Sequence, residues 1–408
     1  MYKIWKKKTT EAIKERVFEA LKANVNYNKQ HVLGIPASYL DKKVFSQDAA
    51  FLKNAPYIAA LVQNPNNIGC HTTGKSLFYF KGTQQLEREL IELCAVDILG
   101  GNPGEQDGYV AGGGTEANMQ AIWIYRNYFK WDCGAKLDEI AIICSEDSHY
   151  SMDKAANVFV LDIIKVPVED TTREITYEAL KKTVEDAIAN GKKYFIVIAN
   201  MMTTMFGSLD DVDLYARVLA EAGVTFKVHV DGAFGGFYSP FTEGPCNLTF
   251  QNPHITSFTI DAHKMAQAPY GTGIFFIRKG FMKYARTETA SYIEGEDSTL
   301  IGSRSGANAI AVWMILAKNG PYGWEEKIFI LQKRTEWLCK KLEARNIEFY
   351  RHPKSNIVTI RSKHIKDELA REFDLMPDDF KNPTWYKIVV MEHVTIEKLI
   401  QFLEMLNA

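Results

Sequence analysis

Four stretches of the sequence combine side chains that could bind or transform a small charged ligand. They are Gly112–Asn118 (GGGTEAN), Ser145–Ala156 (SEDSHYSMDKAA), His229–Gly236 (HVDGAFGG) and Asp261–Met265 (DAHKM). In the first stretch, glycines precede a helical sequence, so the backbone could approach an anion and the free N–H groups of a helix start could bind it. Thr115 adds a hydroxyl donor, although a glycine-rich turn capped by Thr115 is an equal alternative. The spacing matches neither common glycine-rich nucleotide loop.

His149 and Asp231 each lie at the end of a predicted strand. The His149 imidazole could stack on a flat ligand, or it could be a surface residue beside a capped helix start. A carboxylate placed among small residues, as Asp231 is, is costly unless it meets a cation or a hydrogen-bond donor. Asp231 could otherwise be a simple turn former.

Lys264 follows an apolar run, where partial loss of water would lower the pKa of its amine and make the amine nucleophilic. An ordinary surface lysine is the alternative. Taken together, an anion cradle, a stackable histidine, a strand-end acid and a nucleophilic lysine are what pyridoxal phosphate requires. The phosphate would take the helix start, the carboxylate would keep the pyridine nitrogen protonated, and the lysine would form a Schiff base.

The elements that must position these groups alternate between short apolar runs and helical segments. The runs cover residues 139–144, 158–168, 194–200, 226–230, 256–260 and 273–277. Strands that alternate with helices predict an α/β fold with a mostly parallel sheet covered on both faces. In such sheets functional residues gather where strands end.

The flanking regions are helical or mixed. Apolar spacing predicts one helix in the first 51 residues and another over residues 84–98. Beyond residue 305, a helix pair (308–318 and 324–345) precedes strands at 347–350, 356–361 and 387–391 and a last helix at 396–406. We therefore expect an N-terminal helical segment (1–51), a large domain (52–305) and a small α+β C-terminal domain (306–408).

Composition excludes several classes of protein. The 408 residues carry 48 Lys and Arg against 50 Asp and Glu, a balance that does not suit a nucleic-acid partner. No apolar run reaches the roughly 18 residues of a membrane span, and the first residues do not resemble a signal peptide, so we expect a cytoplasmic protein. The six cysteines are irregularly spaced without a CxxC pair, which predicts free thiols and no metal site.

From about Leu33 to its end the sequence resembles the group II pyridoxal-phosphate-dependent amino-acid decarboxylases of fold type I. The motifs above carry the resemblance together with TTMFGSLDD (203–211) and STLIGSRSG (298–306). The end KIVVMEHVT (387–395) is similar to the short tyrosine/aspartate decarboxylases and, less closely, to the short histidine decarboxylases. The resemblance implies a seven-stranded, mostly parallel sheet between helices, a small α+β C-terminal domain and a homodimer with sites at the subunit interface.

The resemblance also implies individual roles. Lys264 would carry the cofactor, Asp231 would pair with the pyridine nitrogen, and His149 and Ala233 would cover the two faces of the ring. The phosphate would be held by residues that share donor groups: Gly113, Gly114, Thr115, His263 and, from the partner subunit, Ser303. Thr204 would lie near the ring edge. Two positions depart from the family: Gly232 stands where alanine is common, and Met202 stands where glycine often precedes the Thr-Thr pair, which weakens the Thr204 assignment.

The implied reaction is α-decarboxylation of an L-amino acid to an amine and CO2 through a Schiff base and a quinonoid. Tyr292 is the candidate proton donor to Cα, with His149 as its rival, although Tyr292 could be an ordinary loop aromatic. His71 could meet the substrate side chain or cap a turn. No basic pair matches a side-chain carboxylate, so we rank aromatic substrates or histidine above glutamate and aspartate.

Two alternatives stay open. One is a carbon–carbon lyase similar to sphingosine-phosphate lyase, which shares the motifs and cleaves a different bond. The other is a non-catalytic relative, against which the joint retention of Lys264, Asp231 and His149 argues.

Overall fold

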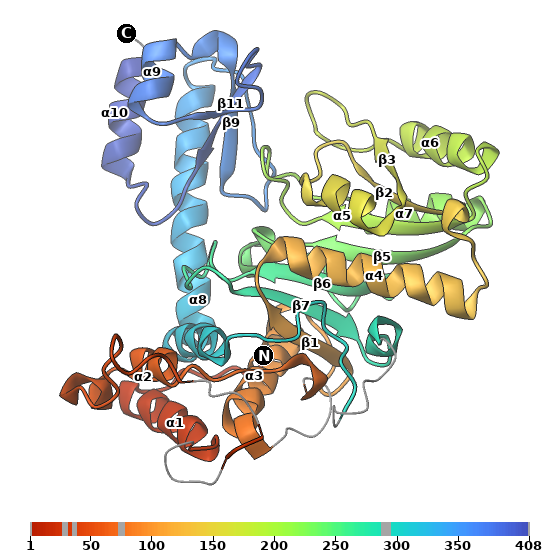
Figure 1. Cartoon of the computed structure of the whole chain (residues 1–408). Helices are drawn as coiled ribbons and strands as arrows, with labels where there is room; N and C mark the ends of the chain where they lie inside the picture. Colours follow the sequence, from red (N-terminus) through yellow and green to blue (C-terminus); the bar gives the residue numbers. More distant parts are fainter. Residues whose placement is uncertain (1, 27–31, 35–38, 72–77, 287–294, 407–408) are drawn as a thin grey trace. The chain divides into compact units, whose positions relative to one another are not determined.

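The computed structural model describes residues 2–26, 32–34, 39–71, 78–286 and 295–406 (Figure 1). The chain divides into two compact units. Unit 1 comprises Met1–Leu137 and Thr249–Trp324, and unit 2 comprises Asp138–Leu248 and Glu325–Ala408. This division into units does not test the expected domain limits at residues 51 and 305, which stay a prediction.

A seven-stranded sheet has the strand order β1-β7-β6-β5-β4-β2-β3. The strands are β1 (Gln106–Ala111), β2 (Ile140–Ser145), β3 (Asp162–Val166), β4 (Tyr194–Asn200), β5 (Thr225–Asp231), β6 (Ile255–Asp261) and β7 (Gly273–Arg278). Strands β3, β2, β4 and β5 pair in parallel, whereas β7 is antiparallel to both β1 and β6. The predicted α/β fold with a mostly parallel sheet is confirmed.

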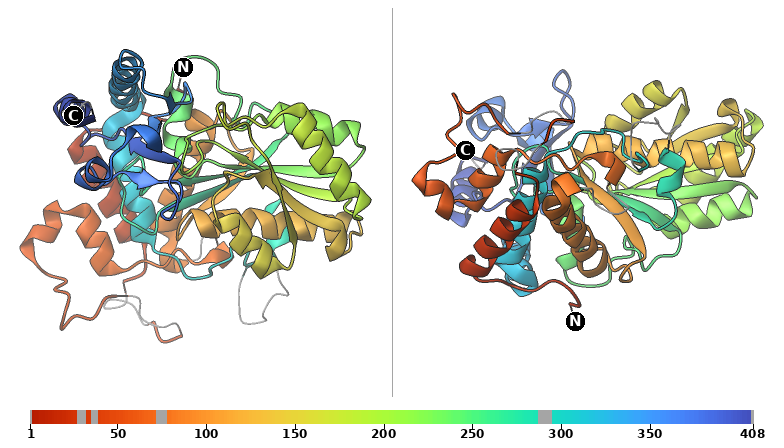
Figure 2. Two further views of the ribbon diagram at one scale, coloured as in Figure 1. Left: turned by 90° about the horizontal axis from the view of Figure 1, so that it is seen from above. Right: turned by 60° about the horizontal axis from the view of Figure 1, so that its bottom comes forward.

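The strands form where apolar residues run without interruption. Every residue of β2 and of β6 is buried, the pattern of strands covered on both faces. The predicted strand over residues 158–168 is too long, because α5 (Ser151–Phe159) takes its first residues and Val160 adopts a left-handed backbone with φ of 55°. Figure 2 shows the strands from two further directions.

Unit 1 holds α1 (Thr10–Ala23), α2 (Pro56–Gln63), α3 (Lys81–Leu93) and α4 (Gly114–Asp132). The Thr9 hydroxyl caps α1 by accepting from the Ala12 N–H at 3.2 Å. Gly82 lets α3 lie directly against α1, since a Cβ there would be 1.8 Å from the carbonyl oxygen of Ala20. The helix predicted over residues 84–98 ends as α3 followed by a π-turn at Cys94–Ile98.

Unit 2 adds α6 (Tyr177–Ala189) and α7 (Val212–Glu221) to the parallel strands, and a second, antiparallel sheet. This small sheet has the order β10-β11-β9-β8, with β8 (Phe349–Tyr350), β9 (Ile357–Arg361), β10 (Met376–Pro377) and β11 (Trp385–Val389). Helices α9 (Asp367–Glu372) and α10 (Ile396–Leu406) accompany it. The expected small α+β C-terminal region is confirmed.

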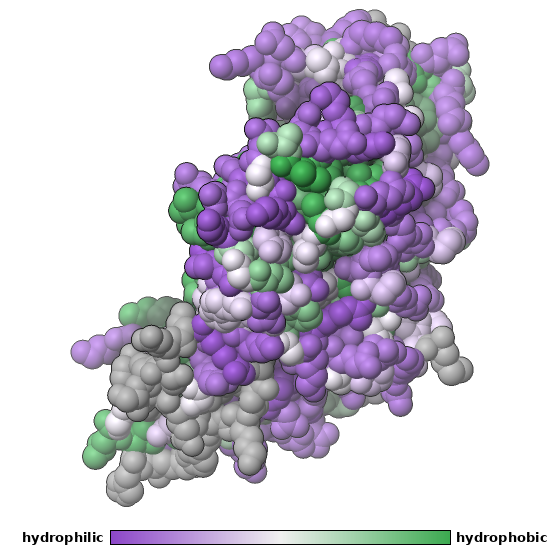
Figure 3. All heavy atoms as spheres, turned by 90° about the vertical axis from the view of Figure 1, so that its right-hand side faces the viewer, coloured by the Kyte–Doolittle hydropathy of each residue, from purple (hydrophilic) through white to green (hydrophobic). Residues whose placement is uncertain are grey.

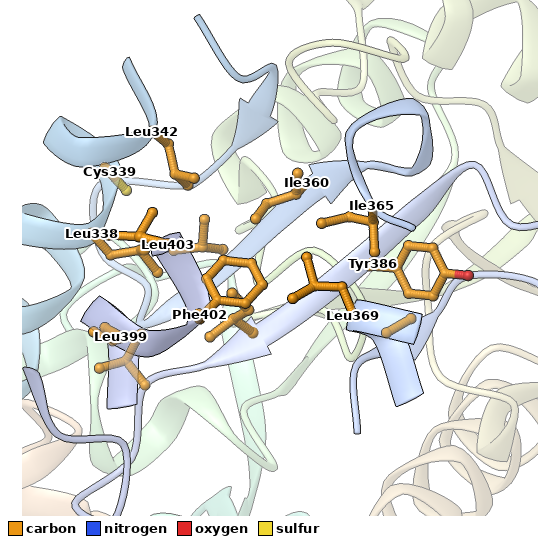
Figure 4. Close-up of a cluster of buried hydrophobic side chains, with 14 residues drawn as sticks. Leu338, Cys339, Leu342, Ile360, Ile365, Leu369, Tyr386, Leu399, Phe402 and Leu403 are labelled. Carbon is orange, nitrogen blue, oxygen red and sulfur yellow. The ribbon is translucent and has the colours of Figure 1, made fainter. Parts of the chain in front are cut away.

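The small sheet packs on a hydrophobic cluster that joins it to three helices. Figure 4 shows Leu338 and Leu342 of α8 (Gly306–Glu343), Ile360 of β9, Leu369 of α9 and Phe402 of α10 gathered there. Helix α8 is interrupted at Gly320, whose φ is 66° and which precedes Pro321, so the predicted helix pair meets at this break.

The six cysteines are free thiols, and burial raises the pKa of Cys144 and Cys339 to about 11. Within the ranges described above, we find no cluster of residues able to hold a metal ion and no helix long and apolar enough to cross a membrane. The face drawn in Figure 3 is mostly hydrophilic, with one area where hydrophobic residues gather.

Candidate functional site

The glycine-rich stretch forms the start of α4 in unit 1. Strand β1 ends at Ala111, and α4 begins at Gly114 with Gly113 as its cap residue, so Thr115 lies in the first turn and is not the cap. The Glu116 carboxylate accepts from the Gly112 N–H at 2.6 Å, which fixes the approach of the loop to the helix. Because the first N–H groups of a helix have no partner within it, this start can receive an anion.

Strand register brings the glycine loop against the DAHKM turn. Gly273, the first residue of β7, pairs with Ala111 of β1 on one side and with Asp261 of β6 on the other. A Cβ at Gly273 would lie 2.4 Å from the carbonyl carbon of Gly113, and a Cβ at Gly114 would lie 2.8 Å from Asp261 Oδ2. Glycine at both positions is therefore what allows the loop and the turn to touch.

Asp261 lies close to both basic side chains of this turn. Its buried carboxylate Oδ2 lies 3.1 Å from Lys264 Nζ and 3.6 Å from His263 Nε2. Burial lowers the pKa of His263, Asp261 partly offsets that effect, and the positive charge of Lys264 lowers the pKa further. At neutral pH the His263 ring is therefore uncharged and can donate one hydrogen bond, while Lys264 keeps about a third of its side chain exposed.

The segment around Ser303 is held by the same chain. Residues 302–305 lie antiparallel to residues 66–69, with the Gly69 N–H bound to the Gly302 carbonyl at 2.7 Å. The Asn66 side-chain amide donates to Ser303 Oγ at 3.2 Å, which leaves the Ser303 hydroxyl hydrogen able to donate elsewhere.

A buried ion pair that sequence reasoning missed anchors this segment. Arg304 and Glu87 are bound to each other, and each side chain is only 4% exposed. Arg304 also donates to the Val110 carbonyl at 3.0 Å, and Glu87 accepts from the Val110 N–H at 2.7 Å. The pair thereby ties residues 302–306 to the end of β1, immediately before the glycine loop.

In unit 2 the candidate residues follow the carboxyl ends of parallel strands. Asn200 ends β4 and Asp231 ends β5, and the two are direct neighbours in the sheet. Asp231 is 7% exposed, and its Oδ1 accepts from the Ala233 N–H at 3.1 Å. That bond fixes the turn that leads from Asp231 to Ala233.

Asn200 links two more groups that were not predicted. Its side-chain amide donates to Asp210 Oδ2 at 2.7 Å and to Ser148 Oγ at 2.8 Å. Burial raises the pKa of Asp210 to about 7, although two hydrogen bonds from Asn200 lower it. Asn200 could have been found in the sequence as the last residue of the apolar run YFIVIAN, whereas the Asp210 contact has no local signal.

His149 is fixed by the start of α5. Its Nδ1 accepts from the Ser151 N–H at 3.2 Å and lies 2.9 Å from Ser151 Oγ. A neutral ring that accepts at Nδ1 carries its proton on Nε2, so Nε2 is the atom able to donate. The His149 ring is thus oriented by the backbone N–H and the hydroxyl of Ser151.

The loop that carries Thr204 contains the Met202 departure. Met202 is buried and has φ of 72°, a left-handed conformation in which glycine would be unstrained. Thr203 and Ser208 close the loop through hydroxyl and backbone hydrogen bonds. Thr204 is exposed, and its carbonyl accepts from Lys387 Nζ at 2.9 Å.

The predicted site residues therefore form two sets. Unit 1 brings together Gly113, Gly114, Thr115, His263 and Lys264 and anchors the Ser303 segment. Unit 2 places His149, Asp231, Ala233 and Thr204 on the strand ends and the loops that follow them. Tyr292 and the side chain of His71 lie outside the described residues.

The residues in unit 1 can be tested for whether they suit the phosphate group of pyridoxal phosphate. The cradle offers helix N–H groups, the Thr115 hydroxyl and a neutral imidazole, all of which donate to phosphate oxygens, next to one amine. Two carboxylates contact the glycine loop, and both have partners: Asp261 is paired with Lys264, and Glu116 accepts from the Gly112 N–H. The donor set fits the phosphate group.

Comparisons with known proteins agree with this chemistry. The family model "Pyridoxal-dependent decarboxylase conserved domain" matches residues 85–360. Tryptophan decarboxylase of Clostridium sporogenes is 51% identical over 399 residues, 97% of this chain and 95% of that protein. A probable L-tyrosine/L-aspartate decarboxylase of Methanococcus maripaludis is 30% identical over 80% of this chain and 85% of its own length.

Solved structures share the fold. L-methionine decarboxylase from Streptomyces sp. 590 superposes with a TM-score of 0.71 at 22% identity, covering 97% of this chain and 93% of that one. The sphingosine-1-phosphate lyase of Burkholderia pseudomallei has a TM-score of 0.68 at 19% identity, over 80% of this chain and 77% of its own. With the family model and a relative at 51% identity both matching most of its length, the chain belongs to the pyridoxal-dependent decarboxylase family.

Proposed function

We propose that this protein decarboxylates an aromatic L-amino acid, with tryptophan as the preferred substrate. The family makes it a pyridoxal-phosphate-dependent carboxy-lyase. The observation that carries the choice of substrate is 51% identity with a tryptophan decarboxylase over nearly the whole chain. The ranking of aromatic above acidic substrates agrees with this choice.

We assign the phosphate to the start of α4. The N–H groups of Gly113 and Gly114, the Thr115 hydroxyl and the neutral His263 would donate to it. Lys264 would hold the cofactor covalently, and Asp261 would keep that amine close to the glycine loop before attachment, as its 3.1 Å contact suggests.

When bound, pyridoxal phosphate accepts the electron pair released as the bond between Cα and the carboxylate breaks. The role assigned to Asp231 is to hold a proton on the pyridine nitrogen, because a buried carboxylate stabilises a charged partner. His149 and Ala233 would fix the ring between them, and Thr204 would bound its edge.

The proton that replaces CO2 at Cα needs a donor. His149 Nε2 carries a proton in the hydrogen-bonded tautomer, and Tyr292 is the alternative donor implied by the family resemblance. We further propose a cytoplasmic homodimer in which Ser303 serves the partner's phosphate, and large and small domains that meet near residue 305.

Replacing Asp231 with asparagine tests the electrostatic part of the assignment. Asparagine keeps the size of the side chain and can still accept from the Ala233 N–H, but it carries no charge. We expect kcat to fall by about 10²–10³-fold, the loss typical when one stabilising group of a buried site is removed. Steady-state amine production, measured beside Asp186→Asn as a surface control, decides the matter. A kcat within threefold of the unmodified enzyme would show that Asp231 does not serve the nitrogen.

The substrate is tested with all twenty amino acids, by mass spectrometry of the amines formed. Tryptophan should give the highest kcat/KM, followed by other aromatic amino acids. A higher value for aspartate or glutamate would overturn the substrate proposal. A carbonyl product in place of an amine and CO2 would favour the carbon–carbon lyase.

A further inference from the structure

Two arginine–aromatic stacks within unit 2 meet at Phe206 of the loop 202–208. The guanidinium carbon of Arg173 lies 4.0 Å from the ring centre of Phe206, and that of Arg361 lies 3.8 Å from the ring centre of Trp385. The two rings meet edge to face, 5.8 Å apart at 89°. In such a stack the guanidinium cation is attracted to the face of the aromatic ring, and the attraction is stronger where water is largely excluded.

The guanidinium of Arg173 also binds Asp147, in the turn before His149. Its Nε donates to Asp147 Oδ2 at 3.0 Å and its Nη2 to Asp147 Oδ1 at 2.5 Å. Both side chains are about one-tenth exposed, 11% for Arg173 and 10% for Asp147. A two-point bond fixes orientation as well as distance, and only arginine can make it while stacking on a ring.

The backbone at Arg173 shows that this placement overrides a local preference. Arg173 has φ of 56°, a left-handed conformation that is unfavourable for a residue other than glycine. A tight turn sustains it, with the Arg173 N–H bound to the Glu169 carbonyl at 2.8 Å. Asp170, in the same turn, pairs with both Arg173 and Arg361 and so joins the two stacks.

The small sheet holds the loop from its other side. Trp385 and Lys387 are two residues apart on β11 and therefore share a face; one contacts Phe206 and the other donates to the Thr204 carbonyl. Gly207 has φ of 65°, and a Cβ there would lie 2.2 Å from Ser355 Oγ, so the loop fits closely against the residues before β9.

We propose that Arg173 is a positioning residue that locks the turn presenting His149 to the loop presenting Thr204, so that the contacts around the cofactor ring depend on the small sheet. The inference rests on the proposed roles of His149 and Thr204. It adds a link between them that passes through Asp147, Arg173 and Phe206 and touches neither substrate nor cofactor.

The test compares Arg173→Gln and Arg173→Lys with Arg217→Gln. Arg217 is the matched control because it also lies over an aromatic ring of unit 2, that of Tyr177 at 5.3 Å, but is itself exposed. For each holoenzyme we would measure the cofactor dissociation constant, the visible circular dichroism of the bound cofactor and the thermal unfolding midpoint.

For Arg173→Gln we expect cofactor binding about tenfold weaker and a reduced visible dichroism, because a small misplacement of positioning groups has large effects. Arg173→Lys should lie between it and the unmodified enzyme, since a lysine keeps the charge but loses the fork. Arg217→Gln should leave both cofactor signals unchanged. If Arg173→Gln does not fold, Phe206→Leu, which keeps apolar volume and removes the ring, should give the same two changes.

Unchanged cofactor affinity and dichroism in Arg173→Gln, or equal changes in Arg217→Gln, would overturn the proposal. A lowered unfolding midpoint with unchanged cofactor signals would do so as well, since Arg173 would then be structural only. None of these readouts uses a substrate, so a wrong substrate assignment leaves this test intact. A failure of the site assignment would appear separately, as an unmodified protein that binds no cofactor.

Discussion

Replacing Lys264 with alanine should abolish the visible absorbance of protein-bound pyridoxal phosphate and lower kcat by at least about 10³-fold. Lys264 supplies the only amine of the DAHKM turn, and loss of a covalent catalytic group is among the most damaging changes an enzyme can undergo. The change also leaves the buried Asp261 carboxylate without its 3.1 Å contact to Nζ. Absorbance spectra of the reconstituted variant and a single-turnover amine assay would measure both effects.

A second variant separates charge from nucleophilicity. Lys264→Arg keeps a cation beside Asp261, but a guanidinium stays protonated and cannot attack a carbonyl. We expect Lys264→Arg to be as inactive as the alanine variant but to have a larger free energy of unfolding. The control Lys279→Ala, on the surface of unit 1, should have the activity and absorbance of the unmodified enzyme. A visible absorbance band retained by either Lys264 variant would refute the assignment.

Replacing Arg304 with methionine should lower the free energy of unfolding by about 3–5 kcal/mol, because it leaves the Glu87 carboxylate buried and uncompensated. Val110 loses a donor to its carbonyl in the same change. The effect would be measured by urea unfolding of the cofactor-bound protein. Loss of the anchor at the end of β1 should also weaken cofactor binding.

The double variant Glu87→Leu/Arg304→Met distinguishes a buried charge from a lost contact. Removing both partners should restore part of the stability, since well-packed apolar residues often replace a buried pair without loss, whereas the Val110 N–H and carbonyl lose their side-chain partners. An exposed pair serves as the control: Lys182→Met, next to Asp186 on α6, should change stability by less than about 0.5 kcal/mol. A double variant as unstable as Arg304→Met alone would contradict this explanation.

The central strands were predictable because buried strands consist of short, nearly continuous runs of apolar residues, which are visible in the sequence. The run YFIVIAN became β4 with the predicted limits. The observed limits of β2, β5 and β6 differ from the predicted ones by one residue at each end, and those of β7 by one residue at its end. Strand β1 was not predicted, since QDGYVA contains polar residues and a glycine whose position is set by contact with β7.

The candidate site was predictable only where a residue type is informative by itself. For a lysine after a strand or a glycine triplet before a helix, the adjacent residues in the sequence are enough to indicate a possible role. The partners of these residues come from remote segments: Arg304 meets Glu87 across 217 residues, and Lys387 meets Thr204 across 183. No local pattern marks an arginine that will be buried or a lysine that will bind a distant carbonyl.

The contacts of the loop 202–208 limit how this chain can be recombined with its relatives. An exchange of the C-terminal region alone would join a foreign β11 to the native Phe206 and separate Trp385 and Lys387 from the loop that they contact. Chimeric enzymes should therefore work best when residues 169–174, 202–208 and β11 are inherited as one block. The inheritable module is then a set of three remote segments, and the order of residues along the chain is a poor guide to where parents can be cut.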